Sequence, residues 1–395
     1  MRIGVDATCW TNRRGYGRFA RALLTAALEL DSSRRYVFFV DDDSTEFPLP
    51  SGVEMVRIRS RVPTVKAAAA DGARSPGDLW TVSRAISAAQ VDVIYFPSVY
   101  SYVPVFSRVP ILVTIHDVIP ERFPQLVFPT LRGKLFWRAK VALACAQARL
   151  IVTVSEYSRR CLVQELRLPP ERIRVVSEAG DPAFLRLTSA DSAALFARLG
   201  LPPGARILAY VGGFSPHKNL PMLVDVFAAL ARSPEYALVH LLLVGDYLGD
   251  VFYSGYRPLA GQVAAAGLQA RVHFTGYMGD DDLRTVFNVA DAVVLPSFCE
   301  GFGLPAVEGA ACGAPAIVTT ESPLPQLLGE GALGVPPGDR EGWRRALADV
   351  LGDSARRERM RAAAIAAASR LSWRSAARQL LDIFDEVTAR RGATP

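Results

Sequence analysis

Short continuous apolar runs alternate along this chain with longer stretches in which apolar residues recur at helical spacing. Runs rich in Val, Ile, Leu and Phe are typical of strands buried on both faces of a parallel sheet. They occur at residues 2–7, 36–40, 56–58, 91–96, 111–115, 150–154 and 172–176, and again at 207–211, 241–244, 292–295, 316–319 and 334–337. Strands alternating with helical patterns predict an α/β fold built on parallel sheets.

A break in this pattern divides the chain into two halves. The sequence Ala179-Gly180-Asp181-Pro182 has the composition of a linker, and a new apolar run opens at residue 207. A chain of 395 residues is long enough for two domains, each with its own core. We therefore predict a first domain over residues 1–180 and a second over 181–373.

The most informative stretch follows the apolar run at 292–295. Gly301 and Gly303 allow a sharp turn and a close approach of the backbone to a ligand, and Pro305 suits the first turn of a helix. The free N–H groups of a helix start can bind a phosphate. Glu300 and Glu308 flank this turn, where their carboxylates would accept hydrogen bonds from sugar or ribose hydroxyls. The alternative is a plain strand–turn–helix unit with solvated glutamates.

This stretch closely resembles the donor-sugar motif of the family 4 retaining glycosyltransferases. The resemblance lies in the two glutamates, the Gly-Phe-Gly-Leu-Pro sequence between them and the Ala-Cys-Gly-Ala-Pro sequence after them. It implies the GT-B fold, in which two Rossmann-like parallel-sheet domains face each other across a cleft. Leu371-Ser372-Trp373 resembles the bend after which the family's last helices cross back, so the helix at 374–395 is expected to join the first domain.

Two further segments of the second half resemble parts of the family's donor site. Lys218 stands at an expected helix start, where a cation is unfavourable unless an anion also binds there. In the family the matching segment reads Arg-Lys-Asn, and its lysine binds the donor diphosphate; here His217 replaces the arginine. The segment at 272–277, with Gly276 and Tyr277, resembles the one that packs against the nucleotide base.

The first half offers a glycine loop and a histidine. The loop at 12–19 lacks the third glycine of a dinucleotide fingerprint, but it resembles the family's loop near the donor phosphates and the acceptor, with Gly17 as its main residue. His116 and Asp117 end the apolar run at 111–115, and ligands bind beyond such strand ends. From position alone His116 is either structural or ligand-binding, but in the family the matching histidine lies beside the transferred sugar. Asp117 is expected to orient it or to cap a loop.

The resemblance implies transfer of a hexosyl group from a nucleoside-diphosphate sugar, of the GDP-mannose or UDP-hexose type, to an acceptor hydroxyl with retention. The acceptor would be a glycan, a lipid-linked sugar or a small molecule of secondary metabolism. Two alternatives are a nucleotide-sugar epimerase or hydrolase of the same fold and a non-catalytic sugar-nucleotide-binding protein. The expected catalytic residues are His116, Lys218 and Glu300. The expected donor-binding residues are Gly17, Gly213, Lys218, Gly276, Tyr277, Glu300, Gly301, Phe302, Gly303, Leu304 and Glu308.

No metal or other cofactor is expected. An Asp-x-Asp motif at a strand end is lacking, since Asp41-Asp42-Asp43 falls in an expected exposed turn. The diphosphate charge would then be stabilised by Lys218 and by helix-start N–H groups. The five cysteines have no paired spacing, which argues against a disulfide framework or a zinc site and favours a reducing cytoplasm.

The positive charge is concentrated in the first half. Residues 1–200 carry 27 Lys and Arg against 19 Asp and Glu. An anionic acceptor or an acidic membrane surface would explain this, and so would arginines spread over solvated faces. Basic and aromatic residues interleave at 132–140, which fits peripheral contact with the inner face of a membrane, or else a helix with Leu135, Phe136 and Trp137 partly in the core. No nucleic-acid motif is present, and no apolar run reaches the roughly 18 residues of a membrane span.

Overall fold

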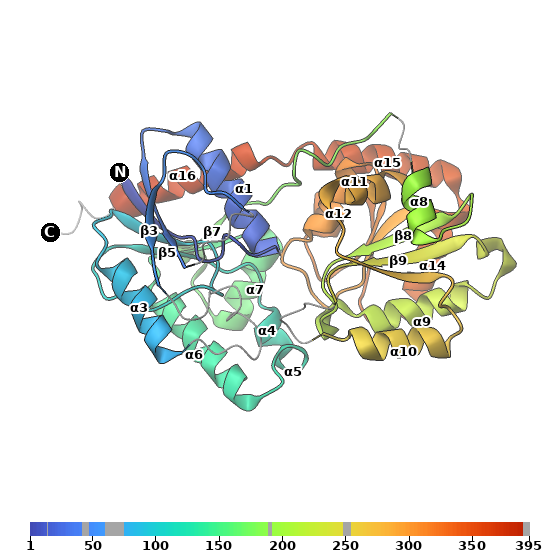
Figure 1. Ribbon diagram of the computed structural model, residues 1–395, viewed down its shortest axis with the longest axis horizontal. Helices are drawn as coiled ribbons and strands as arrows, with labels where there is room; N and C mark the ends of the chain where they lie inside the picture. Colours follow the sequence, from blue (N-terminus) through green and yellow to red (C-terminus); the bar gives the residue numbers. More distant parts are fainter. Residues whose placement is uncertain (14, 42–46, 60–74, 189–191, 248–253, 390–395) are drawn as a thin grey trace. The chain divides into compact units, whose positions relative to one another are not determined.

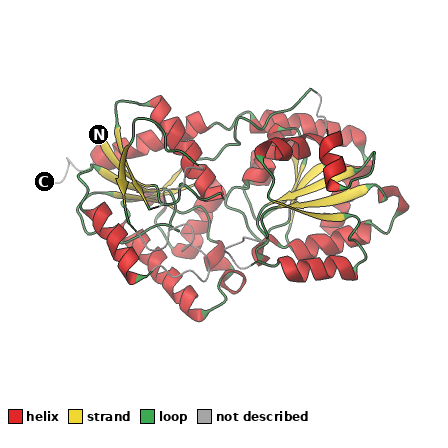
Figure 2. Ribbon diagram, in the orientation of Figure 1, coloured by secondary structure: helices red, strands yellow, loops and turns green. Residues whose placement is uncertain are grey.

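The computed structural model describes residues 1–13, 15–41, 47–59, 75–188, 192–247 and 254–389. The chain divides into two compact units, each with a parallel sheet covered by helices (Figures 1 and 2). Unit 1 is Met1–Glu178 together with the described residues from Ser372 onward, and unit 2 is Ala179–Leu371. The predicted boundaries follow residues 180 and 373.

Unit 1 contains a parallel sheet of seven strands within its described residues, in the order β3-β2-β1-β4-β5-β6-β7. The strands are β1 (Arg2–Asp6), β2 (Arg35–Val40), β3 (Glu54–Arg57), β4 (Val93–Phe96), β5 (Ile111–Thr114), β6 (Leu150–Thr153) and β7 (Ile173–Val175). The central strands β4, β5 and β6 are buried along their whole length, which explains their continuous apolar sequences.

Helices cover the sheet of unit 1. They are α1 (Gly15–Leu30), α3 (Pro76–Ser87), α4 (Ile119–Arg122), α5 (Pro124–Val127), α6 (Leu131–Gln147), α7 (Glu156–Leu166) and α16 (Trp373–Ala389). The expected loop at 12–19 is shorter than predicted because α1 already begins at Gly15. Ser75, Thr130 and Ser155 begin three of these helices by accepting a hydrogen bond from a first-turn N–H.

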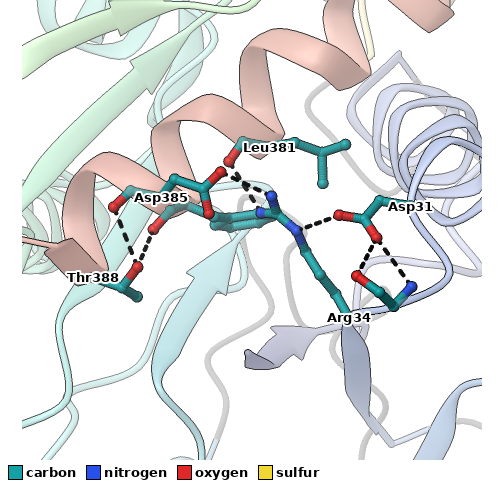
Figure 3. A network of polar contacts seen from close by, with 7 residues as sticks. Asp31, Arg34, Leu381, Asp385 and Thr388 are labelled. Atoms are coloured by element: carbon teal, nitrogen blue, oxygen red, sulfur yellow. Dashed lines mark hydrogen bonds and ion pairs between the residues drawn. The ribbon is translucent and has the colours of Figure 1, made fainter.

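The last helix, α16, belongs to unit 1, although residues of unit 2 precede it in the sequence. Phe384 of α16 packs edge-on against Tyr95 of β4. Arg34 forms ion pairs with Asp31 at 2.8 Å and with Asp385 of α16 at 2.9 Å, and it donates a hydrogen bond to the Leu381 carbonyl oxygen (Figure 3). The predicted return of the C-terminal helix to the first domain is therefore confirmed.

Unit 2 contains a second parallel sheet, with six strands among its described residues in the order β10-β9-β8-β11-β12-β13. The strands are β8 (Arg206–Val211), β9 (Val239–Val244), β10 (Val272–Gly276), β11 (Ala292–Leu295), β12 (Ala316–Thr319) and β13 (Ala332–Val335). The helices are α8 (Ala193–Leu199), α9 (Leu220–Leu230), α10 (Tyr256–Ala265), α11 (Asp280–Val289), α12 (Leu304–Ala311), α13 (Leu324–Leu328), α14 (Arg340–Gly352) and α15 (Ser354–Ala368). The predicted two-domain parallel α/β fold is confirmed.

Candidate active site

The loops that follow β8, β9 and β10 meet at the carboxyl edge of the second sheet. The Gly212 N–H donates to the Val244 carbonyl oxygen at 2.9 Å, and the Gly245 N–H donates to the Gly276 carbonyl oxygen at 3.0 Å. A Cβ on Gly245 would collide with the Gly212 carbonyl oxygen, so glycine is needed for the two loops to touch. Ligands of open parallel sheets bind at this edge, which is where Gly213 and Gly276 were predicted to act.

Lys218 is held at this edge by its neighbour Asn219. Lys218 ends a short 3-10 turn, Pro216–Lys218, and Asn219 has a φ of 57°. The Asn219 side-chain amide donates to the carbonyl oxygens of Pro296 and Pro337, at 3.1 and 3.0 Å. The lysine therefore precedes α9, and the expectation that it lies in the helix's first turn is corrected. The left-handed conformation of Asn219 separates the turn from the helix.

Lys218 and Glu300 form an ion pair at the centre of this region. The Lys218 Nζ atom lies 2.7 Å from Glu300 Oε1, and the Ser297 hydroxyl donates to the same oxygen at 2.5 Å. The two side chains are only 20% and 12% exposed. Backbone bonds hold the pair, because Phe298 N–H donates to the His217 carbonyl oxygen and Glu300 N–H to that of Glu321. Two motifs 82 positions apart thus place an ammonium beside a carboxylate.

This pair offers two kinds of polar contact to one ligand. The ammonium has three donors, which suit phosphate oxygens, while the carboxylate only accepts and suits hydroxyl groups. Ser297 was not predicted as part of the site. Its position three residues before Glu300, at the end of an apolar strand, was the available signal.

The glycine turn leads directly from Glu300 into α12. Gly303 is the residue before α12 and has a φ of 98°, and a Cβ there would lie 2.6 Å from Leu324 Cδ1. Gly301 and the side chains of Phe302 and Leu304 are buried. Any donor contact from Phe302 or Leu304 would therefore use their backbone groups, since Pro305 has no N–H and the next two N–H groups of α12 already donate to the Gly303 carbonyl oxygen.

Glu308 lies one turn inside α12, and its side chain is buried. Gly180 lies against it, since a Cβ built on Gly180 would be 3.5 Å from Glu308 Cγ. Burial, reinforced by the nearby Glu308 carboxylate, raises the pKa of the Cys312 thiol to about 12.

Tyr277, unlike Glu308, is exposed and lies beyond the end of β10. The assignments of Glu308 to ribose and of Tyr277 to the base remain predictions.

In unit 1, His116 stands just beyond β5 with its imidazole held by the protein. Its Nε2–H donates to the Pro97 carbonyl oxygen at 3.0 Å, and its Nδ1 lies 3.4 Å from Glu178 Oε1. The ring meets Phe19 edge-on, with centroids 4.7 Å apart. Both ring nitrogens thus face protein acceptors, and a role for His116 toward a sugar remains a prediction. Glu178 was missed, because nothing in the sequence links it to a residue so far away.

Local structure explains why the other two residues singled out in the first half, Asp117 and Gly17, occur at their positions. Asp117 accepts a hydrogen bond from the Ile119 N–H at 2.9 Å, so it caps the loop before α4, as one of its two expected roles required. Gly17 lies inside α1, where a Cβ would collide with the Asn12 carbonyl oxygen. This packing alone requires glycine at position 17, and contact with the donor stays a prediction.

No group of three or more His, Cys, Asp or Glu that could hold a metal ion occurs within the described ranges. Asp42 and Asp43, expected in an exposed turn, lie outside the described residues. Across the same ranges, no helix is both long enough and apolar enough to cross a membrane.

Sequence comparison matches both halves of the chain to glycosyltransferase families. The family described as "Glycosyltransferase Family 4" matches residues 15–184, and the one described as "Glycosyl transferases group 1" matches residues 191–367. D-inositol 3-phosphate glycosyltransferase from Stackebrandtia nassauensis is 32% identical over 63% of this chain and 57% of its own length. O-antigen chain mannosyltransferase B from Escherichia coli is 27% identical over 60% of each chain. The chain thus spans little more than half the length of the curated relatives it matches.

Solved structures share the fold over nearly the whole chain. Sucrose-phosphate synthase from Thermosynechococcus elongatus has a TM-score of 0.78 at 20% identity and covers 99% of this chain and 100% of its own. Anabaena HepE in complex with UDP and glucose has a TM-score of 0.73 at 20% identity and covers 98% and 100%. With family matches over both units and this shared fold, the chain belongs to the family 4 glycosyltransferases of the GT-B fold.

Proposed function

We propose that this protein is a retaining glycosyltransferase that moves a hexosyl group from a nucleoside-diphosphate sugar to an acceptor hydroxyl. The observation that carries the proposal is the Lys218–Glu300 pair, at 2.7 Å, on the carboxyl edge of the second sheet and directly before the glycine turn into α12. A diphosphate and the sugar attached to it are adjacent parts of one molecule. The ammonium of Lys218 suits the diphosphate, and the neighbouring carboxylate of Glu300 suits the hydroxyls of the sugar.

In this proposal Lys218 stabilises the charge that develops on the leaving diphosphate, together with N–H groups at the start of α12. Glu300 accepts hydrogen bonds from hydroxyls of the donor sugar, and Ser297 orients the carboxylate by donating to Oε1. Glu308 binds the ribose hydroxyls. The leaving phosphate takes the proton of the acceptor hydroxyl, and His116, fixed by Pro97 and Glu178, helps to position the transferred sugar.

The donor is proposed to be GDP-mannose or a UDP-hexose. The relative named as a mannosyltransferase supports a mannose donor, and the HepE complex with UDP-glucose supports a UDP-hexose. The acceptor is proposed to be a hydroxyl of a glycan, a lipid-linked sugar or a small molecule. No metal is required in this scheme, because Lys218 and backbone N–H groups carry the diphosphate charge.

The test combines donor binding with transfer. We expect GDP-mannose or UDP-glucose to raise the melting temperature of the full chain, since a ligand that binds only the folded state stabilises it. Lys218→Ala and Glu300→Ala should each lower the transfer rate at least about 100-fold, the order of effect expected when a charge-stabilising group is removed. Arg340→Ala is the matched control, because Arg340 forms an exposed ion pair with Asp225 in the same unit.

Three results would contradict the proposal. Normal transfer by Lys218→Ala at low donor concentration would remove the diphosphate assignment. Conversion of the donor without any acceptor would indicate an epimerase or hydrolase. A product whose anomeric configuration, measured by NMR, is opposite to that of the donor would exclude retention.

A further inference from the structure

Helix α6 presents a row of apolar side chains to solvent. Leu131 is 71% exposed and Phe136 54% exposed, and Leu135 and Leu143 are also exposed. Ala139, Ala142 and Ala146 are exposed as well. These positions share one side of the helix, since 131, 135, 139, 142 and 146 recur every three or four residues and 136 and 143 lie beside them. Soluble monomers rarely expose a contiguous apolar surface of this kind without a partner for it.

The opposite side of α6 already packs against the unit 1 core. Val141 and Ala144 are buried there, and Trp137 packs beside them and donates its indole N–H to Glu121 Oε1 at 2.7 Å. The expectation that Leu135 and Phe136 lie partly in the core is therefore wrong. Because Trp137 and Val141 face the core, Leu135 and Phe136 point to the opposite side. The helix is therefore apolar on both its core side and its solvent side.

The charges on α6 all have one sign. The helix carries Arg132, Lys134, Arg138 and Lys140, and none of its residues Leu131–Gln147 is acidic. Arg132 and Arg138 are exposed among the apolar side chains. Lys140 also donates to the Tyr100 carbonyl oxygen at 2.5 Å. A partner for this surface must accept apolar side chains and cations together.

Helix α3 lies beside α6 in unit 1 (Figure 1), and the segment that joins their ends by hydrogen bonds carries another exposed aromatic residue. Val105 exchanges two backbone hydrogen bonds, both 3.0 Å, with the side-chain amide of Gln147 at the end of α6. The next residue, Phe106, donates its N–H to the Ser87 hydroxyl at the end of α3. Phe106 and Trp80 of α3 are both exposed, with ring centroids 5.9 Å apart.

We propose that this surface, formed by Leu131, Leu135, Phe136, Leu143, Trp80 and Phe106 with Arg132 and Arg138, binds an anionic lipid bilayer. Leucine and aromatic side chains enter the interface between headgroups and acyl chains, and the cations pair with lipid phosphates. A helix of 17 residues is about 25 Å long and can lie flat on such a surface. A second copy fits less well, because a symmetric dimer through α6 would bring its like charges together.

The test uses the full chain and sedimentation with vesicles. We expect binding to vesicles of phosphatidylcholine mixed with phosphatidylglycerol, little binding to phosphatidylcholine alone, and weaker binding at high salt. Arg132→Glu/Arg138→Glu should weaken binding at least about tenfold, since each cation near an anionic surface contributes about 1 kcal/mol and 1.4 kcal/mol is tenfold. Leu135→Ser/Phe136→Ser should also weaken it at least about tenfold, since the apolar area that these two side chains bury in the bilayer interface is lost. Circular dichroism checks that the variants fold.

Matched controls come from unit 2, where Leu238 is 49% exposed and Arg344 pairs with Glu341 on the surface of α14. Leu238→Ser and Arg344→Glu should bind vesicles like the unaltered protein. No binding to anionic vesicles, or equal binding by the α6 variants, would overturn the proposal. So would a dimer in analytical ultracentrifugation that Leu135→Ser/Phe136→Ser dissociates, because this surface would then belong to a second copy. None of these outcomes depends on the proposed sugar transfer.

Discussion

At the scale of single residues, the backbone angle of Gly303 and its contact with Leu324 explain why the turn before α12 needs glycine. Its φ of 98° lies in the region that L side chains rarely adopt. A Cβ would also stand 2.6 Å from Leu324 Cδ1, which is closer than such contacts occur. The glycine therefore fixes the path from Glu300 into the helix through both backbone conformation and packing.

Gly303→Ala should lower the free energy of unfolding by about 1–3 kcal/mol, because strain in φ and the clash with Leu324 add. Chemical denaturation measures this change. Gly279→Ala is the matched control, since Gly279 also precedes a helix, α11, with a φ of −67° and open space around its added Cβ. We expect a smaller loss there, no more than about 1 kcal/mol, because Ala is a poorer N-cap than Gly but meets neither strain nor a clash at this position. Equal effects of the two substitutions would contradict this explanation.

At the scale of elements, the strands were readable from sequence and the contacts between distant elements were not. The continuous apolar runs predicted the strands, for example β11 and β12, because parallel strands are buried on both faces. The sequence also singled out Lys218 and Glu300 through motifs. It gave no sign of their direct ion pair or of Glu178 beside His116, since such contacts depend on how separate loops pack.

Helix boundaries and helix faces were the weaker predictions. Glycines at Gly15 and Gly17 indicated a loop, but glycine is tolerated in the first turns of a helix and α1 includes both. In α6, apolar residues occur all round, so periodicity could not tell the core side from the solvent side. The structure identifies the core side of α6 as the one that carries Trp137, whose indole N–H donates to Glu121.

The attachment of α16 to unit 1 gives a prediction at this scale. Arg34 is nearly buried and bonds Asp31, Asp385 and the Leu381 carbonyl oxygen (Figure 3). Arg34→Ala removes the Arg34 donor from all three acceptors, while Asp31 keeps its hydrogen bonds from Ser33, and we expect a loss of about 1–2 kcal/mol in the free energy of unfolding. Amides of α16 should also exchange faster in hydrogen-exchange measurements.

The control for this prediction is Arg344→Ala, which removes an exposed ion pair within α14 and should change stability by less than about 0.5 kcal/mol. If exchange in α16 were unchanged in Arg34→Ala, the helix would be held by its apolar face alone. That face includes Leu380, Phe384 and Val387.

At the scale of the whole molecule, each unit contains a group with little exposure whose shifted pKa makes stability depend on pH, and Glu121 in unit 1 and His240 in unit 2 act in opposite directions. In unit 1, burial raises the pKa of the Glu121 carboxyl to about 7. In unit 2, burial lowers the pKa of His240 to about 4, with a smaller contribution from the neighbouring His273. The two histidines touch at 3.0 Å near the amino ends of β9 and β10, at the opposite edge of this sheet from Lys218.

The direction in which stability changes with pH follows from the protons that the folded and unfolded chains bind. Between about pH 6.5 and 4 the unfolded chain binds a proton at His240 and the folded chain does not, so acidification lowers the stability of unit 2 by up to about 1.4 kcal/mol per pH unit. Between about pH 4.5 and 7 the folded chain keeps a proton at Glu121 that the unfolded chain loses, so unit 1 loses stability as pH rises.

His240→Leu should therefore weaken the pH dependence of unit 2 between pH 6.5 and 4, because one of two neighbouring histidines that burial keeps neutral is gone; burial also lowers the pKa of the other, His273. Hydrogen exchange of peptides from β9 and β10, corrected for the intrinsic exchange rate at each pH, measures unit 2 separately. Glu121→Gln is the control: it should leave β9 and β10 unchanged and flatten the opposite trend in β4 and β5. If β9 and β10 responded to acid equally with and without His240, the acid sensitivity of unit 2 would have to arise from other groups.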